Sequence, residues 1–194
     1  MRFTRKDGLI YGVGTLGFGK YDTVTNSFAY KSWFNILERC YNHANKYKSY
    51  QDCIVCEEWK NFQNFAEFYY GDHYRKNGWH LDKDLLVKKN RIYSPERCAY
   101  VPPEINKMLV KRYIHRGNTP IGVVYESKRK TYKATMHCYG KTHNLGRYHT
   151  VEEAFYAYKK AKELHIREVA EKYKGDISPR VYDALINYTV EITD

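Results

Sequence analysis

Hydrophobic residues in the first half of the chain recur with the spacing of helices. From Ser32, which suits a helix N-cap, apolar positions fall on one helical face: Trp33, Ile36, Leu37 and Cys40. A second helix is predicted over 57–70, where apolar positions again repeat at three and four: Trp59, Phe62, Phe65, Ala66 and Tyr69. The two helices are expected to pack together. Ahead of them, residues 8–30 carry five glycines among alternating apolar and polar residues, which predicts one or two short strands with tight turns.

The middle of the chain has a strand, loop, strand and helix pattern. Residues 79–86 predict a short strand, and residues 97–102 predict its return partner. A helix is expected to begin near Pro103 and to end at Gly117. A domain boundary is expected at 114–119, since the hydrophobic period changes there from that of a helix to that of strands.

Beyond Pro120 the pattern predicts three short strands and a long helix. The strands are expected over 121–127, 130–140 and 141–148, and the helix follows Thr150, with Glu153 completing a capping box. A last helix is expected to start at Ser178 and Pro179. The fold class is therefore α+β: an N-terminal helical region with a strand, loop, strand and helix segment, followed by a three-stranded antiparallel sheet packed on an α-helix.

Alternation along the middle strand of this sheet separates two kinds of side chain. Tyr132, Ala134 and Met136 point one way, and can pack on a helix face formed by Ala154, Tyr158 and Ala161. The opposite face carries Lys133, Thr135 and His137, and is flanked by further cations: Arg129, Lys130, Lys141 and Arg147. Such a face has the width and charge to enter a DNA major groove. The alternative is a solvated sheet face, which composition alone favours.

Composition favours a polyanionic partner. Thirty-three Lys and Arg against 22 Asp and Glu leave a formal charge of +11. No apolar run approaches the length of a membrane span, and the first residues lack the pattern of a signal peptide, so we expect an intracellular, cytoplasmic protein with no membrane partner. Five cysteines then predict free thiols or a metal site rather than disulfides.

Several motifs of the C-terminal region resemble a known DNA-binding domain. The segments GVVY, TYKATM, NLGRYHTVEEAFYAYKKA and EKY are similar to the plant ethylene-response-factor domain over residues 118–175. The resemblance implies that fold and a role in binding double-stranded DNA. The family presents arginines on its first strand, whereas Val124 and Glu126 stand here, so a different target sequence is expected. Together, face geometry and flanking charge give the predicted DNA-binding residues: Arg129, Lys130, Lys133, Thr135, His137, Lys141, Thr142, Asn144 and Arg147.

A second group of polar residues lies in the strand, loop, strand and helix segment. It contains His80, Asp82, Lys83, Asp84, Asn90 and Asn106. Two carboxylates and an amide converging there could hold one hard divalent ion. The alternative is a charged hairpin followed by a helix that happens to carry an Asn, and residue types alone favour it.

The same segment resembles the ββα-metal finger of HNH endonucleases. LDKD stands at the family's Asp-His position, PERC at its Pro-Glu-Asn-Leu position and Asn106 at its last position. The wider pattern also resembles phage and mobile-element homing proteins that join such a finger to an ethylene-response-type domain. This divides the chain into a nuclease domain over 1–115 with its finger at 79–110, the DNA-binding domain at 118–175 and a C-terminal helix at 176–194.

The resemblance implies a metal-dependent nuclease site, but one with altered residues. Mg²⁺ or Mn²⁺ would be held by Asp82, Asp84 and Asn106, and the catalytic residues would be His80, Lys83 and Asp84. The family's general-base His is absent from its position, so His80 or Lys83 would replace it, with His80 favoured because it shares a strand face with Asp82. Arg97 stands where the family has an Asn.

Cysteine spacing raises a further possibility of a structural zinc ion. Cys53 and Cys56 have the spacing of a zinc knuckle, and Cys40 and Cys98 would complete four thiolates. Only one pair has the tight spacing, so buried thiols without a ligand are favoured over zinc.

Three hypotheses of function follow. The first is a homing-type endonuclease that hydrolyses phosphodiester bonds, with target choice by the C-terminal domain. The second is a phage DNA-binding or regulatory protein with a degenerate finger. The third is a protein that binds a host protein partner and inhibits a host nucleic-acid enzyme.

Overall fold

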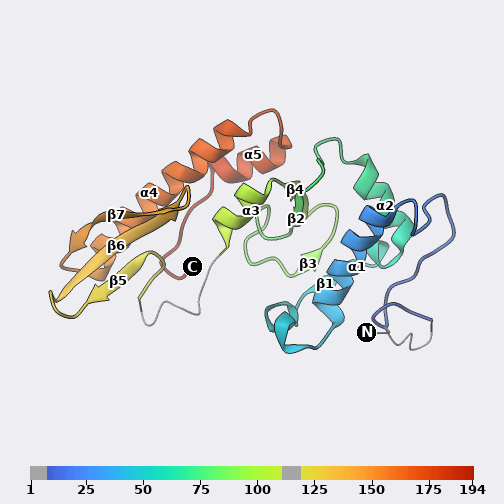
Figure 1. Cartoon of the computed structure of the whole chain (residues 1–194), viewed down its shortest axis with the longest axis horizontal. Coiled ribbons are helices and arrows are strands. Elements are labelled where there is room, and N and C mark those ends of the chain that lie inside the picture. The colour runs from blue at the N-terminus through green and yellow to red at the C-terminus, as the bar shows by residue number, and fades with distance from the viewer. Residues whose placement is uncertain (1–7, 111–118) are drawn as a thin grey trace. The chain divides into compact units, whose positions relative to one another are not determined.

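The computed structural model describes residues 8–110 and 119–194, and the chain folds as two compact units, residues 1–102 and 103–194 (Figure 1). The described residues form five α-helices and three small sheets. The predicted α+β class, with helices first and a three-stranded antiparallel sheet on a helix second, is confirmed. The units divide at Pro102 and Pro103, ahead of the boundary expected at 114–119.

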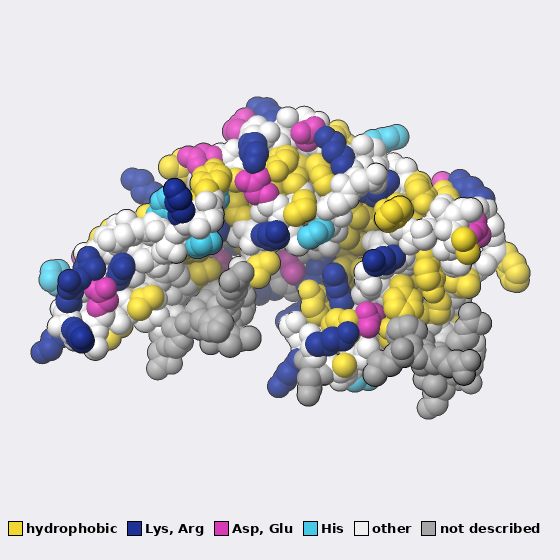
Figure 2. All heavy atoms as spheres, viewed as in Figure 1, with side chains coloured by type: hydrophobic (Ala, Val, Ile, Leu, Met, Phe, Trp, Pro, Cys, Tyr) yellow, Lys and Arg dark blue, Asp and Glu magenta, His cyan; other side chains and the backbone are white. Residues whose placement is uncertain are grey.

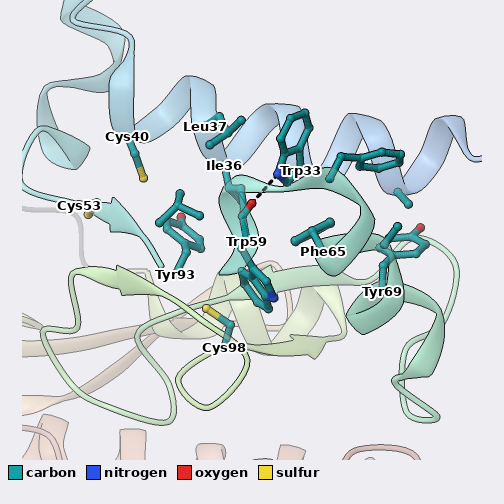
Figure 3. Close-up of a cluster of buried hydrophobic side chains, with 14 of the residues drawn as sticks. Trp33, Ile36, Leu37, Cys40, Cys53, Trp59, Phe65, Tyr69, Tyr93 and Cys98 are labelled. Carbon is teal, nitrogen blue, oxygen red and sulfur yellow. Dashed lines mark hydrogen bonds between the residues drawn. The ribbon is translucent and has the colours of Figure 1, made fainter. Parts of the chain in front are cut away.

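The first unit is built on α1 (Ser27–Tyr41) and α2 (Phe62–Gly71), which pack together as predicted. All nine apolar positions expected on the two helical faces are buried. Trp33 and Trp59 lie at the centre of this aromatic core, and the indole Nε1 of Trp33 donates a hydrogen bond to the Trp59 carbonyl at 2.6 Å (Figure 3). Burial of these large rings stabilises the unit through the hydrophobic effect.

Two expectations for the start of this unit are wrong. Helix α1 begins at Ser27 with Asn26 at its N-cap, so Ser32 lies inside the helix. In place of the strands predicted within residues 8–30, residues 8–26 form isolated bridges, such as Ile10 with Gly14, and residues 27–30 belong to α1. A Cβ at Gly14 would lie 2.5 Å from Leu37 Cδ1, so glycine here lets the backbone lie directly against α1.

Two strand pairs complete the first unit. β1 (Ile54–Val55) pairs in parallel with β3 (Ile92–Tyr93), and β2 (His80–Asp82) pairs antiparallel with β4 (Ala99–Val101). The second pair is the one predicted from sequence, although β2 is shorter than expected. β1 was not predicted, nor was η1 (Asn45–Tyr50), and the helix expected at 57–70 opens with a separate 3-10 turn, η2 (Glu58–Lys60).

The second unit begins with α3 (Pro103–Leu109) and contains the predicted three-stranded sheet. β5 (Val123–Glu126), β6 (Thr131–Cys138) and β7 (Lys141–Tyr148) are antiparallel in the order β5-β6-β7. The rest of the helix expected after Leu109, up to Gly117, lies almost entirely outside the described residues.

Helix α4 (Val151–Lys172) covers one face of this sheet, and α5 (Pro179–Ile186) packs on α4. Ala134 and Met136 are buried against Ala154 and Tyr158, as alternation predicted, and the predicted Tyr132 and Ala161 are partly buried in the same cluster. The capping box of Thr150 and Glu153 is present. Pro179 begins α5 as expected, but the Ser178 side chain makes no capping hydrogen bond. No helix within residues 8–110 or 119–194 has the length and apolar character needed to cross a bilayer.

Candidate functional site

The face of the sheet that α4 does not cover carries the predicted polar row. Lys133 in β6 lies between Val124 of β5 and Arg147 of β7. Further along β6, Thr135 lies opposite Asn144, and His137 lies opposite Thr142. The pairing therefore brings three predicted residues of β6 and three of β7 onto one surface.

A β-bulge in β7 keeps this surface continuous. Ala134 pairs with Gly146 and Thr135 pairs with Asn144, so Leu145 is an extra residue in β7. Gly146 has a φ of +127°, which favours glycine. Asn144 and Arg147 are three positions apart and would point to opposite faces of a regular strand. With the extra residue, both lie opposite outward-facing residues of β6.

The polar groups of this face are exposed and arranged to donate and accept hydrogen bonds. His137 and Asn144 are exposed, and the His137 Nδ1 lies 3.2 Å from the Thr142 hydroxyl oxygen. Arg129 and Lys130 are exposed in the β5–β6 turn, and Lys141 is exposed at the start of β7. Figure 2 shows Lys and Arg side chains gathered over the region of β5, β6 and β7.

An ion pair on the same face was not predicted. Arg147 Nε donates to Glu126 Oε2 at 2.7 Å, and Arg129 Nη1 lies 3.7 Å from the same oxygen. The hydrogen bond from Arg147 is the main reason that the pKa of Glu126 lies below its ordinary value, so Glu126 is a carboxylate at neutral pH. Two of the predicted DNA-binding cations thus share one acidic partner.

In the finger segment, Asp82 ends β2 and turns the chain. Its Oδ1 accepts hydrogen bonds from the backbone N–H groups of Asp84 at 2.9 Å and Leu85 at 2.7 Å. Burial nevertheless raises the pKa of Asp82 above its ordinary value, because these two hydrogen bonds offset only part of the lost hydration. The Asp82 carboxylate is therefore the hydrogen-bond acceptor that holds the turn at Asp84 and Leu85.

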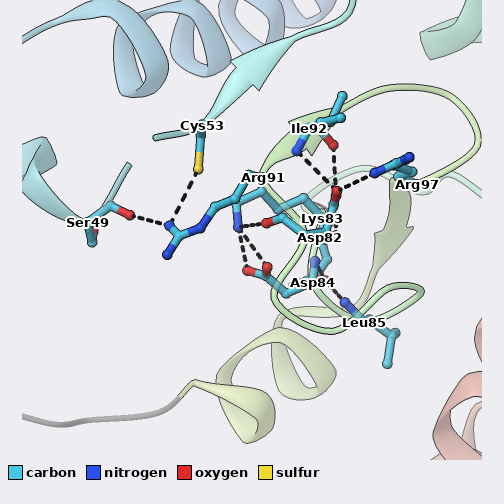
Figure 4. A network of polar contacts seen from close by, with 10 residues as sticks. Ser49, Cys53, Asp82, Lys83, Asp84, Leu85, Arg91, Ile92 and Arg97 are labelled. Atoms are coloured by element: carbon cyan, nitrogen blue, oxygen red, sulfur yellow. Dashed lines mark hydrogen bonds and ion pairs between the residues drawn. The ribbon is translucent and has the colours of Figure 1, made fainter. Parts of the chain in front are cut away.

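Lys83 is buried at the centre of the loop that follows (Figure 4). Its ammonium lies 2.7 and 2.8 Å from the two carboxylate oxygens of Asp84, and donates to the Asn90 carbonyl at 2.9 Å. The Asn90 side chain closes the loop from the other end, donating to the carbonyls of Lys83 at 2.8 Å and Ile92 at 2.7 Å. Arg97 adds a contact of 3.4 Å to the Asn90 side-chain oxygen. Lys83 and Asn90 together hold the loop in one conformation.

The carboxylates predicted to hold a divalent metal contact groups of the chain itself in this arrangement. Both Asp84 oxygens contact the Lys83 ammonium, and Asp82 Oδ1 accepts two backbone N–H groups. Asn106 belongs to α3, in the second unit. Among the residues that the structure describes, no group of three or more His, Cys, Asp and Glu side chains is placed to bind a metal. His80, the candidate base, is exposed on β2.

The four cysteines of the first unit form no disulfide. Cys40, Cys53 and Cys98 are buried and Cys56 is half-buried. Burial raises the pKa of Cys40 and of Cys98 to about 12, so both thiols are protonated at neutral pH.

Comparison with known proteins adds no relative to this picture. No protein-family model, no curated protein and no solved structure matches the chain. The functional argument therefore depends on the residues of this chain and on their geometry.

Proposed function

We propose that this protein binds double-stranded DNA through the outer face of the β5-β6-β7 sheet. The observation that supports this most is the separation of the two faces: α4 covers one, and the other gathers cations and hydrogen-bonding side chains of β6 and β7. Three strands about 4.8 Å apart span roughly 10 Å. A B-DNA major groove is about 12 Å wide, so it admits such a sheet.

The face divides by chemistry into two kinds of contact. Arg129 and Lys130 lie in the β5–β6 turn, where long cationic side chains reach phosphates beside a groove. Lys141, predicted for the same face, lies opposite Cys138, on the α4 side of the sheet. Thr135 and Asn144 lie near the middle of the sheet and carry the donors and acceptors that base edges require. We place this activity in the cytoplasm, where the protein would meet DNA.

Salt-dependent binding tests the proposal. Binding to a duplex of mixed sequence is measured over a range of salt concentrations for the parent and for Lys130→Gln and Lys133→Gln. Each substitution is expected to weaken binding and to lower the salt slope by about 1. Lys160→Gln is the matched control, because Lys160 is exposed on α4 and not on the sheet. Face variants that bind as tightly as the parent would contradict the proposal.

DNA cleavage by the finger is a second candidate function. The order of β2, a loop that contains β3, β4 and α3 favours it, since the resemblance implies a strand, loop, strand and helix in that order. His80 and Asp84 are also exposed. The Lys83–Asp84 pair would have to open before Mg²⁺ or Mn²⁺ could reach both Asp84 oxygens. Nicking of a plasmid with either metal, lost in Asp84→Ala and His80→Ala, is the expected result for a nuclease.

The outcomes separate the three hypotheses. Salt-dependent binding without nicking under either metal supports a DNA-binding or regulatory protein with a degenerate finger. Nicking that depends on Asp84 and His80 supports an endonuclease. A parent protein that neither binds nor nicks DNA supports the remaining hypothesis, binding to a host protein.

A further inference from the structure

The basic face contains an acidic residue whose presence a general attraction to DNA does not explain. Glu126 is the single Asp or Glu in β5, β6 and β7. A carboxylate on a surface that approaches phosphates lowers affinity for every DNA sequence alike. An inference about its role rests on the proposed function, because it concerns the same face.

Glu126 and Arg147 are joined across the middle strand. Glu126 is opposite Thr131 in β6, and Arg147 is opposite Lys133 in the same strand. Arg147 Nε donates to Glu126 Oε2 at 2.7 Å, and Arg147 Nη2 lies 3.5 Å from Glu126 Oε1. The carboxylate therefore lies along the Nε and Nη2 edge of the guanidinium, and holds it from the side.

This arrangement leaves the end of the guanidinium available. An Arg side chain has five N–H donors in a rigid plane, and Glu126 takes one from Nε and one from Nη2. The donors at the Nη1 and Nη2 end can still form two parallel hydrogen bonds. Guanine offers two matching acceptors, O6 and N7, in the major groove.

We propose that Glu126 is a positioning residue that orients Arg147 to read one guanine in the major groove. Glu126 fixes the guanidinium before DNA arrives, so less side-chain freedom is lost when the base contact forms. The negative charge of Glu126 also repels DNA phosphates, and so weakens binding that depends on phosphate contacts alone. Glu126 thereby lowers the affinity for DNA of any sequence and raises the discrimination between bases.

The experiment begins with selection of binding sites from a random duplex pool by the parent protein. The selected site is expected to contain a guanine at which any other base weakens parent binding by about tenfold, the discrimination of one good bidentate contact. Binding to that site, to its single-base variants and to random duplex is then measured for the parent, Glu126→Gln, Arg147→Lys and the double variant. Glu152→Gln, which removes the same charge from an exposed position of α4, is the control.

Three results are expected. Glu126→Gln binds random duplex several-fold more tightly than the parent, which also shows that the variant is folded. It loses most of the discrimination at the guanine. Arg147→Lys loses the same discrimination, because an ammonium lacks the planar fork, and the double variant loses no more than either single variant.

The contrary results differ for the two proposals. A parent that binds DNA, but whose base preference is unchanged in Glu126→Gln or in Arg147→Lys, overturns the role of Glu126 and leaves the proposed function standing. A parent that binds no duplex at any salt concentration overturns both.

Discussion

The ammonium of Lys83 contacts both carboxylate oxygens of Asp84, at 2.7 and 2.8 Å. The buried ammonium also donates to the Asn90 carbonyl and lies over the Tyr50 ring, 5.9 Å from its centroid. The positive charge that faces Asp84 is therefore supplied by its neighbour in the chain.

Replacing Lys83 by Met should destabilise the first unit. The substitution keeps the aliphatic stem, but it leaves the Asn90 carbonyl without its donor and Asp84 without its counter-ion. We expect a loss of about 1–3 kcal/mol in the free energy of unfolding, measured by urea denaturation. Lys89→Met, at an exposed position of the same loop, should change it by less than about 0.5 kcal/mol. Equal losses in the two variants would argue against the role of Lys83.

Asp82→Asn should gain stability relative to the parent as the pH rises. Burial raises the pKa of Asp82, so the folded state favours the protonated form. The stability that protonation contributes is present below the ordinary pKa of about 3.9, and is lost as the pH rises through the raised pKa. Asn is neutral throughout and keeps an oxygen for the N–H groups of Asp84 and Leu85. Unfolding of both proteins between pH 3 and pH 7 checks this, and a constant difference would contradict it.

The sequence predicted those elements whose signal is local and repeated. Trp33, Ile36 and Leu37 share a helical face, so their burial followed from spacing alone. The pair β1 and β3 joins Ile54 to Ile92, and two-residue strands far apart in the chain have no periodicity to detect. The loop at Lys83 could not be predicted for a related reason. The Lys83 ammonium is buried because Lys83 and Asn90, seven residues apart, hydrogen-bond to one another, and this contact exists only once the loop has closed.

Two glycines of the second unit distinguish the cost of backbone strain from the cost of a steric clash. Gly122 and Gly140 have φ values of +78° and +73°. A Cβ at Gly122 would lie 2.0 Å from the Tyr158 ring, whereas a Cβ at Gly140 meets nothing within 4 Å. Gly140→Ala should therefore cost only the backbone strain, about 1 kcal/mol, and Gly122→Ala about 3 kcal/mol or more. Urea denaturation compares the free energies of unfolding of the two variants. Similar losses would show that the Tyr158 ring can move aside without a cost in free energy.

His165 should make the second unit sensitive to acid. Burial and the charge of Lys162 lower its pKa, and the carboxylates of Glu168 and Glu104 oppose them only partly. Its ring also packs edge-on to Tyr139, 4.8 Å between centroids. Because the unfolded chain binds the proton more readily, stability should fall as the pH drops below about 6.5.

The variant His165→Leu should remove this dependence. The measurement is the thermal midpoint between pH 5 and pH 7.5, compared among the parent, His165→Leu and a control, His143→Gln, which changes an exposed histidine of β7. An unchanged pH dependence in His165→Leu would assign the acid sensitivity to another group.

The extra residue in β7 has a consequence for redesign of this sheet. Asn144 and Arg147 share a face because Leu145 adds one position between them. Deleting one residue from that interval, with every other amino acid unchanged, would restore regular alternation and turn one of the two side chains toward α4. Side chains on the outer face can thus be exchanged for new targets, provided that the three-residue interval between positions 144 and 147 is retained.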